Sequence, residues 1–191
     1  MSQFEFIFTL YSLLLGLSLV ELLSGLGRTV KARLHVDETI ADAFKIGWLT
    51  PLLGLFVMLD LLSFWSAAWS VRDMISVNGF TLMAIMLFAS SYYMAAHLVF
   101  PDDIPTDGNL DPHYFRVRRI VVGVLLVLLF VQLGFYLSQP TLAPRLASPV
   151  PLLLTALLIA LMTAACFAKS KIANGLILSG LILRYVVVYV L

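Results

Sequence analysis

Residues 120–137 read IVVGVLLVLLFVQLGFYL, eighteen residues in a row without a charged side chain. A helix needs about 20 mostly apolar residues to cross the hydrocarbon core of a bilayer. Soluble helices instead carry their apolar residues as a stripe, with polar residues on the opposite face. The stretch therefore predicts a transmembrane helix.

Five further stretches have the same character. They cover residues 6–26, 46–69, 80–100, 151–168 and 172–191. Composition agrees, because 61% of the 191 residues are hydrophobic and 12% are charged, whereas soluble domains carry about 25% charged residues. The sequence predicts an all-α bundle of about six transmembrane helices. We expect these helices to form a single integral membrane domain over residues 1–191.

Loop charges predict how the chain is oriented. The odd-numbered loops hold nine basic residues: Arg28, Lys31, Arg33, Lys45, Arg116, Arg118, Arg119, Lys169 and Lys171. The even-numbered loops hold Arg72 and Arg145. Cytoplasmic loops are enriched in Lys and Arg, so the odd-numbered loops are predicted to be cytoplasmic and both termini to lie outside.

The first apolar stretch lacks a basic start and is long, so we expect a retained helix, not a cleaved signal. The chain looks like a short bacterial inner-membrane protein.

Two short motifs recur in the two halves of the chain. Asn78 and Asn174 each precede a glycine and an apolar run, 96 residues apart, and Pro51 and Pro151 each begin Pro-Leu-Leu. Two inverted halves of three spans are typical of many transporters. Apolar runs also align easily by chance, and chance is the favoured explanation.

Ionisable residues inside the spans are the main candidate functional residues, because a charge in hydrocarbon is costly without a partner. Asp60 and Arg184 lie at matching depth, somewhat outside the midplane, and are predicted to touch. A structural ion pair between the second and sixth spans is favoured, since a fully hydrogen-bonded pair is a stable arrangement. A gate or a substrate contact is the alternative.

Glu21 and His97 form a second candidate pair, at matching depth in the cytoplasmic third of the bundle. His97 shares a helical stripe with Tyr93. Histidine titrates near neutral pH, so this pair could relay protons. In the competing interpretation, Glu21 reaches toward Arg28 or the interface and His97 caps the interface; the sequence leaves both open.

The segment between the third and fourth spans is acidic and rich in proline. Asp102, Asp103 and Asp107 are oxygen ligands of the kind that Mg²⁺ prefers, and the run resembles the aspartate-rich motif of membrane prenyltransferases. Its spacing differs from that motif, however, and two prolines interrupt it. A solvated loop is favoured, and we predict neither a metal nor another cofactor.

The fifth span carries alanines at every fourth position, namely Ala156, Ala160, Ala164 and Ala168. Small residues let transmembrane helices approach closely. The stripe predicts a close helix contact, either within one chain or between two chains.

Three classes of function remain. The favoured class is a small transporter or channel with a polar path lined by the first three helices, where the polar residues concentrate. The first alternative is a structural or accessory subunit of a membrane complex, because hydrolase, metalloprotease and phosphate-loop motifs are absent from the sequence. The second is a lipid-modifying enzyme that uses the aspartate-rich loop. Expected partners are the lipid bilayer and a second copy or a larger complex. A net charge of +1 gives no basic surface for nucleic acid.

Overall fold

The computed structural model describes residues 3–34, 47–75, 78–103 and 108–190. Within these ranges it contains six long α-helices, two short helical segments and no β-strand. The long helices are α1 (Gln3–Leu34), α2 (Leu49–Ser70), α3 (Gly79–Val99), α4 (Asp111–Ser138), α6 (Pro149–Phe167) and α7 (Lys171–Val190). The short ones are η1 (Arg72–Met74) and α5 (Ala143–Leu146). Each long helix is long and apolar enough to cross a membrane, which confirms the predicted helical membrane bundle.

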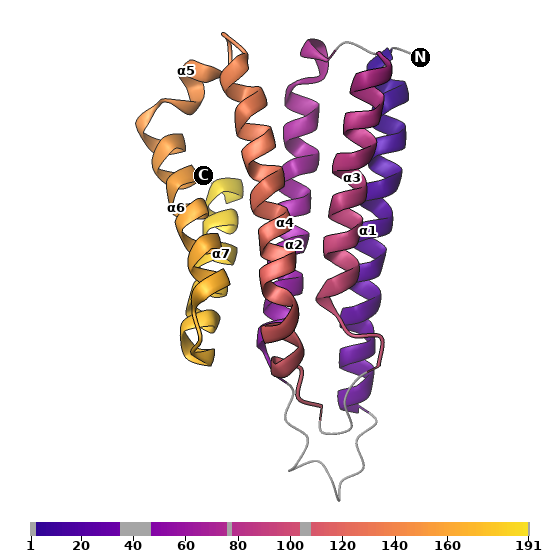
Figure 1. Cartoon of the computed structure of the whole chain (residues 1–191), viewed down its shortest axis with the longest axis vertical. Coiled ribbons are helices and arrows are strands. Elements are labelled where there is room, and N and C mark those ends of the chain that lie inside the picture. The colour runs from indigo at the N-terminus through magenta and orange to yellow at the C-terminus, as the bar shows by residue number, and fades with distance from the viewer. Residues whose placement is uncertain (1–2, 35–46, 76–77, 104–107, 191) are drawn as a thin grey trace, which may run out of the picture.

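Two helices are longer than the spans that the sequence predicts. α1 continues beyond residue 26 to Leu34, and α4 begins at Asp111, nine residues before residue 120. The added turns carry basic residues such as Arg28 and Arg116, which the predicted apolar runs leave out. Both extensions lie at the same end of the bundle, where α1 and α3 end and α2 and α4 begin (Figure 1).

α2 is the central helix of the bundle. It packs against α1, α3, α4 and α7, while α1 packs along α3 and α3 along α4 (Figure 1). α6 and α7 form a hairpin that packs against α4 and α2. Within the two halves, the α1–α2 and α2–α3 contacts have counterparts in α4–α6 and α6–α7, whereas α4 and α7 do not pack closely along each other as α1 and α3 do. The possible repeat stays a hypothesis.

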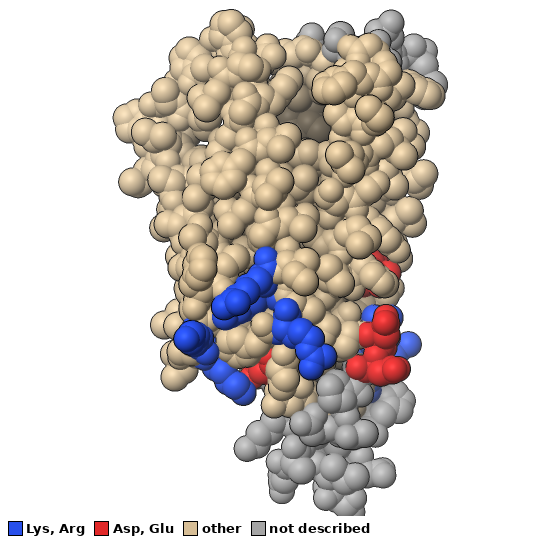
Figure 2. Space-filling model, viewed as in Figure 1, with Lys and Arg blue, Asp and Glu red and all other residues tan. Residues whose placement is uncertain are grey.

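Most of the described basic residues lie at one end of the bundle. Figure 2 shows Lys and Arg side chains gathered near the end where α1 and α3 end and α2 and α4 begin, while the opposite half of that face shows none. The described basic residues of that end are Arg28, Lys31, Arg116, Arg118, Arg119, Lys169 and Lys171. The described basic residues next to the odd-numbered connections thus lie at the same end of the bundle.

The alanine stripe of α6 faces away from the rest of the bundle. Ala156, Ala160 and Ala164 are exposed, whereas Leu158 and Met162 form the inward face of this helix. The prediction that the stripe is a helix contact within one chain is therefore wrong. The buried residues of α6 are Leu158, Met162 and the small Ala165, which lie on a different side of the helix from the stripe. A contact between two chains through the stripe stays a prediction.

One aromatic ring joins three helices near the charged end. Phe100 directly follows α3 and is buried, with 6% of its surface exposed. A Cβ built on Gly25 of α1 would lie 2.4 Å from the Phe100 ring, and one built on Gly54 of α2 would lie 2.9 Å from it. The ring therefore occupies space left by two glycines. The Gly25 side of α1 therefore packs against protein.

Candidate functional site

The centre of the candidate site is the carboxylate of Asp60, midway along α2. Only 9% of the Asp60 surface is exposed. The Tyr92 hydroxyl of α3 donates to Asp60 Oδ2 at 2.6 Å, and the Tyr185 hydroxyl of α7 donates to Oδ1 at 2.5 Å. Both tyrosines are themselves buried. A buried carboxylate is costly unless hydrogen-bonded, and here two neighbouring helices each supply one donor.

Arg184 lies beside this carboxylate without forming the predicted ion pair. Among the described side chains, the ion pairs involve other residues, and no hydrogen bond joins Arg184 to Asp60. The guanidinium instead lies over the Tyr185 ring, with Cζ 4.7 Å from the ring centroid. Its Nε is buried and has no hydrogen-bond partner in the described part of the chain. The prediction of direct contact is wrong because tyrosine hydroxyls take the two carboxylate oxygens.

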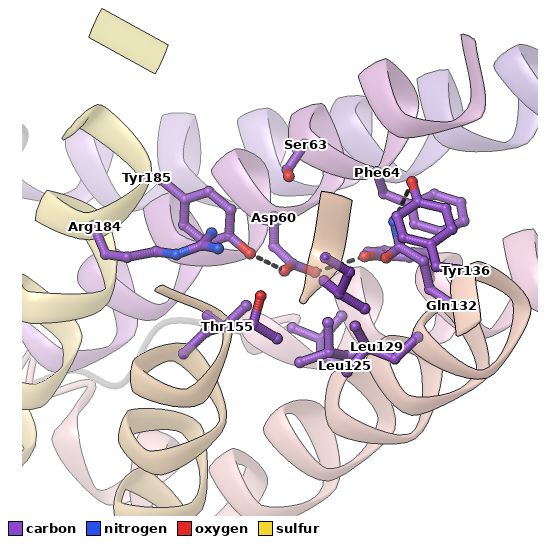
Figure 3. A pocket seen from close by; sticks show the side chains of 14 residues that line it. Asp60, Ser63, Phe64, Leu125, Leu129, Gln132, Tyr136, Thr155, Arg184 and Tyr185 are labelled. Carbon is purple, nitrogen blue, oxygen red and sulfur yellow. Dashed lines mark hydrogen bonds between the residues drawn. The ribbon is translucent and has the colours of Figure 1, made fainter. Parts of the chain in front are cut away.

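Asp60 and Arg184 line a common cavity of about 140 Å³, which we call the Asp60 cavity. Figure 3 shows both charged groups directed into it from α2 and α7. Its other lining residues are Ser63, Phe64, Tyr92, Leu125, Leu129, Gln132, Leu133, Tyr136, Leu146, Thr155, Leu158 and Tyr185. The lining thus comes from both halves of the chain. It extends from Asp60 to Leu146 of α5, at the end of the bundle opposite the charged end (Figure 1).

Further hydroxyl and amide groups surround Asp60. The Gln132 side-chain amide donates to the Tyr136 hydroxyl at 3.2 Å, and Figure 3 shows both on the side of Asp60 away from Arg184. Tyr11 of α1 packs its ring against Phe64, with centroids 5.6 Å apart. Its hydroxyl is buried without a described partner. The cavity region therefore retains unused hydrogen-bonding capacity in a largely apolar bundle.

The second predicted pair forms, on the surface of the bundle and outside this cavity. Glu21 Oε1 and His97 Nδ1 are 3.1 Å apart, bringing α1 and α3 together. The His97 ring stacks on Tyr93, with centroids 6.1 Å apart and planes inclined by 12°. The side chains of His97 and Glu21 are 47% and 27% exposed. His97 lies two residues from the end of α3, near the charged end. A proton-relay role for this pair stays a prediction.

A polar network that the sequence analysis did not single out fixes the charged end. Asn174 of α7 is fully buried; its Oδ1 accepts from the Tyr114 hydroxyl at 2.7 Å and from Arg118 Nη1 at 2.8 Å. Its Nδ2 donates to the carbonyls of Ala168 and Ser170 at 2.9 and 2.8 Å. Arg118 also donates to the Ala168 carbonyl. In the sequence, the signal for this network is Asn174, a polar residue within an apolar span. The sequence analysis considered Asn174 only as part of the possible repeat.

The aspartate-rich loop gives no metal centre among the described residues. Asp102 and Asp103 are exposed, and Asp107 lies outside the described residues. No group of three His, Cys, Asp or Glu side chains within the described ranges is arranged to hold a metal. Asp111, in the same segment of sequence, instead pairs with Lys171 at 3.0 Å and accepts from the Leu49 backbone N–H at 3.4 Å.

The fold and the composition define an integral membrane protein built as a helical bundle, with a polar cavity between its two halves. No protein-family model matches the chain, and neither a curated protein nor a solved structure does.

Proposed function

We propose that the protein is a small membrane transporter or channel whose solute path passes through the Asp60 cavity. The observation that carries the proposal is a buried carboxylate lining a cavity at mid-bundle depth. Ionisable residues at this depth commonly face cavities and mark substrate or ion pathways. Transporter sites also lie near the bilayer midplane, where two halves of the chain meet. The lining residues from α2, α3, α4, α6 and α7 fit that description.

This path differs from the one that the sequence predicts. A path lined by the first three helices would include Glu21, but Glu21 and His97 lie on the surface of α1 and α3. The Asp60 cavity uses α2 and α3 from the first half and the three long helices of the second half. The favoured path is therefore one between the two halves.

Flux through reconstituted protein tests the proposed function. Purified protein in liposomes is assayed for movement of protons, common ions and small metabolites. We expect the wild type to carry at least one solute, and Asp60→Asn to reduce that flux by about tenfold or more, because it removes the charge that the path is built around. Asp103→Asn is the matched control, since it makes the same change on an exposed loop and should leave flux unchanged.

The result with Glu21→Gln separates the two candidate paths. Full flux in this variant, with loss in Asp60→Asn, supports a path through the Asp60 cavity. Loss in Glu21→Gln with full flux in Asp60→Asn would move the path to the surface pair on α1 and α3. Melting curves of each variant show whether the fold is retained. Absence of flux in wild-type liposomes for every solute class would contradict a transport function.

We further propose that the membrane is the bacterial inner membrane and that the charged end is cytoplasmic; the excess of basic residues in the odd-numbered connections supports this orientation. A single cysteine at Asp103, in a Cys166→Ala background, should resist an impermeant thiol reagent in intact cells and react in inverted vesicles. A cysteine at Thr141, in the α4–α6 connection, should behave in the opposite way. Labelling of the Asp103 position in intact cells would reverse the orientation.

The alternative function is that of a subunit in a larger membrane complex. The outward alanine stripe of α6 favours it, because small residues on an exposed face allow another transmembrane helix to approach. Purification in mild detergent distinguishes the two functions. A stoichiometric protein partner, together with absence of flux, would support the subunit.

A further inference from the structure

We propose that the Asp60 cavity binds a small zwitterion, of the size and charge pattern of a short α-amino acid. The inference rests on the function proposed above and names the substrate class of that site. It starts from the two opposite charges that line the cavity without pairing directly with each other in the described part of the chain.

Asp60 supplies the site for a cationic group. Each carboxylate oxygen accepts one hydrogen bond from a tyrosine hydroxyl, and an ionised carboxylate has about four acceptor positions in all. An ammonium group could therefore donate to Asp60 and to the phenolic oxygens of Tyr92 and Tyr185. The three oxygens come from α2, α3 and α7, so the ligand would bridge both halves of the chain.

Arg184 supplies the site for an anionic group. Its guanidinium is directed into the cavity (Figure 3), and its Nε is buried with no acceptor among the described residues. Guanidinium groups bind carboxylates through two parallel hydrogen bonds. A carboxylate ligand would provide the missing acceptors. The Tyr185 ring beneath the guanidinium holds the Arg184 side chain in place.

Charge balance selects a ligand that carries both groups. A lone cation near Asp60 would be repelled by Arg184, and a lone anion near Arg184 would be repelled by Asp60. A zwitterion places each of its charges next to the opposite charge of the protein and adds no net charge to a cavity inside an apolar bundle. Binding therefore leaves neither Asp60 nor Arg184 with an unpaired charge, the expensive state inside a membrane.

The volume of the cavity limits the ligand. An engineered cavity of about 150 Å³ in another protein holds benzene, so a cavity of about 140 Å³ suits a ligand of similar size. Glycine and alanine are in this range. Leu125, Leu129 and Leu158 form an apolar part of the lining, against which a methyl group can pack. The site should prefer alanine to leucine.

Calorimetric titration of the purified protein in mild detergent tests the inference. The probes are L-alanine, methylammonium with only the cationic group, and acetate with only the anionic group. We expect L-alanine to bind more tightly than either half. Asp60→Asn and Arg184→Gln should each weaken alanine binding by about 30-fold or more, on the scale for removing one partner of a buried charge pair. Asp103→Asn, on the exposed loop, should bind alanine as the wild type does.

Two controls keep the test decisive. Melting curves show whether each variant folds. Arg184→Lys retains the charge while removing the two-pronged donor geometry, so it should bind alanine with intermediate affinity.

Acetate binding as tight as alanine binding, or unchanged alanine affinity in Arg184→Gln, would overturn the zwitterion site. Absence of alanine binding, with flux of another solute that requires Asp60, would overturn this inference and leave the proposed transport function in place. Alanine binding without any flux would overturn the proposed transport function and leave the zwitterion site in place.

Discussion

Replacing Asn174 with alanine is expected to lower the free energy of unfolding by about 3–5 kcal/mol, because it disrupts a fully buried hydrogen-bond network. Four hydrogen bonds to Tyr114, Arg118, Ala168 and Ser170 are lost together. The loss is larger than for an isolated amide, because the Arg118 charge stays buried, with 3% of its surface exposed. The Tyr114 hydroxyl also loses its acceptor. Unfolding in detergent, followed by near-ultraviolet circular dichroism, measures the change.

Asn78→Ala is the matched control for this variant. Asn78 is also followed by glycine, but it is exposed, and its Oδ1 caps α3 by accepting from the Thr81 backbone N–H at 2.8 Å. Loss of such a cap costs about 1 kcal/mol. Equal destabilisation by the two substitutions would show that the Asn174 network does not hold the α6–α7 hairpin to α4.

Gly25→Ala is expected to destabilise the bundle by about 1–3 kcal/mol, the usual range for overpacking a filled core. The added methyl group would lie 2.4 Å from Cγ and Cδ2 and 2.6 Å from Cβ of Phe100. Cβ is fixed to the backbone, so rotation of the ring does not relieve the overlap. On its other side the ring lies against Gly54 of α2. α1 and α3 therefore have to move apart, which should lower the melting temperature.

Gly27→Ala provides a control two residues along the same helix. A Cβ built at Gly27 meets no atom within 4 Å. Alanine favours the helix over glycine by about 1 kcal/mol in exposed positions, so this variant should melt at the wild-type temperature or slightly above it. If both alanine variants melted together, Phe100 would not be confined by Gly25.

The number and order of the helices could be predicted because each apolar run has to satisfy its own backbone hydrogen bonds in a membrane, which a helix does locally. The ends of the helices were harder to predict. α1 and α4 continue past the apolar runs through Arg28 and Arg116. Hydropathy locates the hydrocarbon boundary, and a helix does not have to end there.

The position of each ionisable residue along its predicted span gives its depth in the membrane. Depth alone predicts only some of the pairs that these residues form. It paired Glu21 with His97, which are 3.1 Å apart. It also matched Asp60 with Arg184, which share a cavity, while the direct partners of Asp60 are Tyr92 and Tyr185. The rotation of each helix decides between these outcomes. Rotation follows from the packing of all six helices, and the depth of a residue does not contain that information.

The same limit explains the alanine stripe. Periodicity showed that Ala156, Ala160 and Ala164 share one face of a helix, but it could not show whether that face lies inside the bundle. In a membrane, lipid-facing and protein-facing surfaces are both apolar, so hydrophobicity does not distinguish them. Polar residues carry more information in this setting. Asn174 would have marked the inward face of α7 correctly.

The hydrogen bonds of Arg118 impose an order on assembly during synthesis. Its acceptors, the Ala168 carbonyl and Asn174, lie 50 and 56 residues further along the chain. While α4 emerges from the ribosome, neither acceptor has emerged, so we expect the guanidinium to stay at the hydrated surface of the membrane. Arrival of the last two helices then supplies the acceptors and draws the arginine into the protein. The α6–α7 hairpin therefore packs last, and it holds helices that have already inserted.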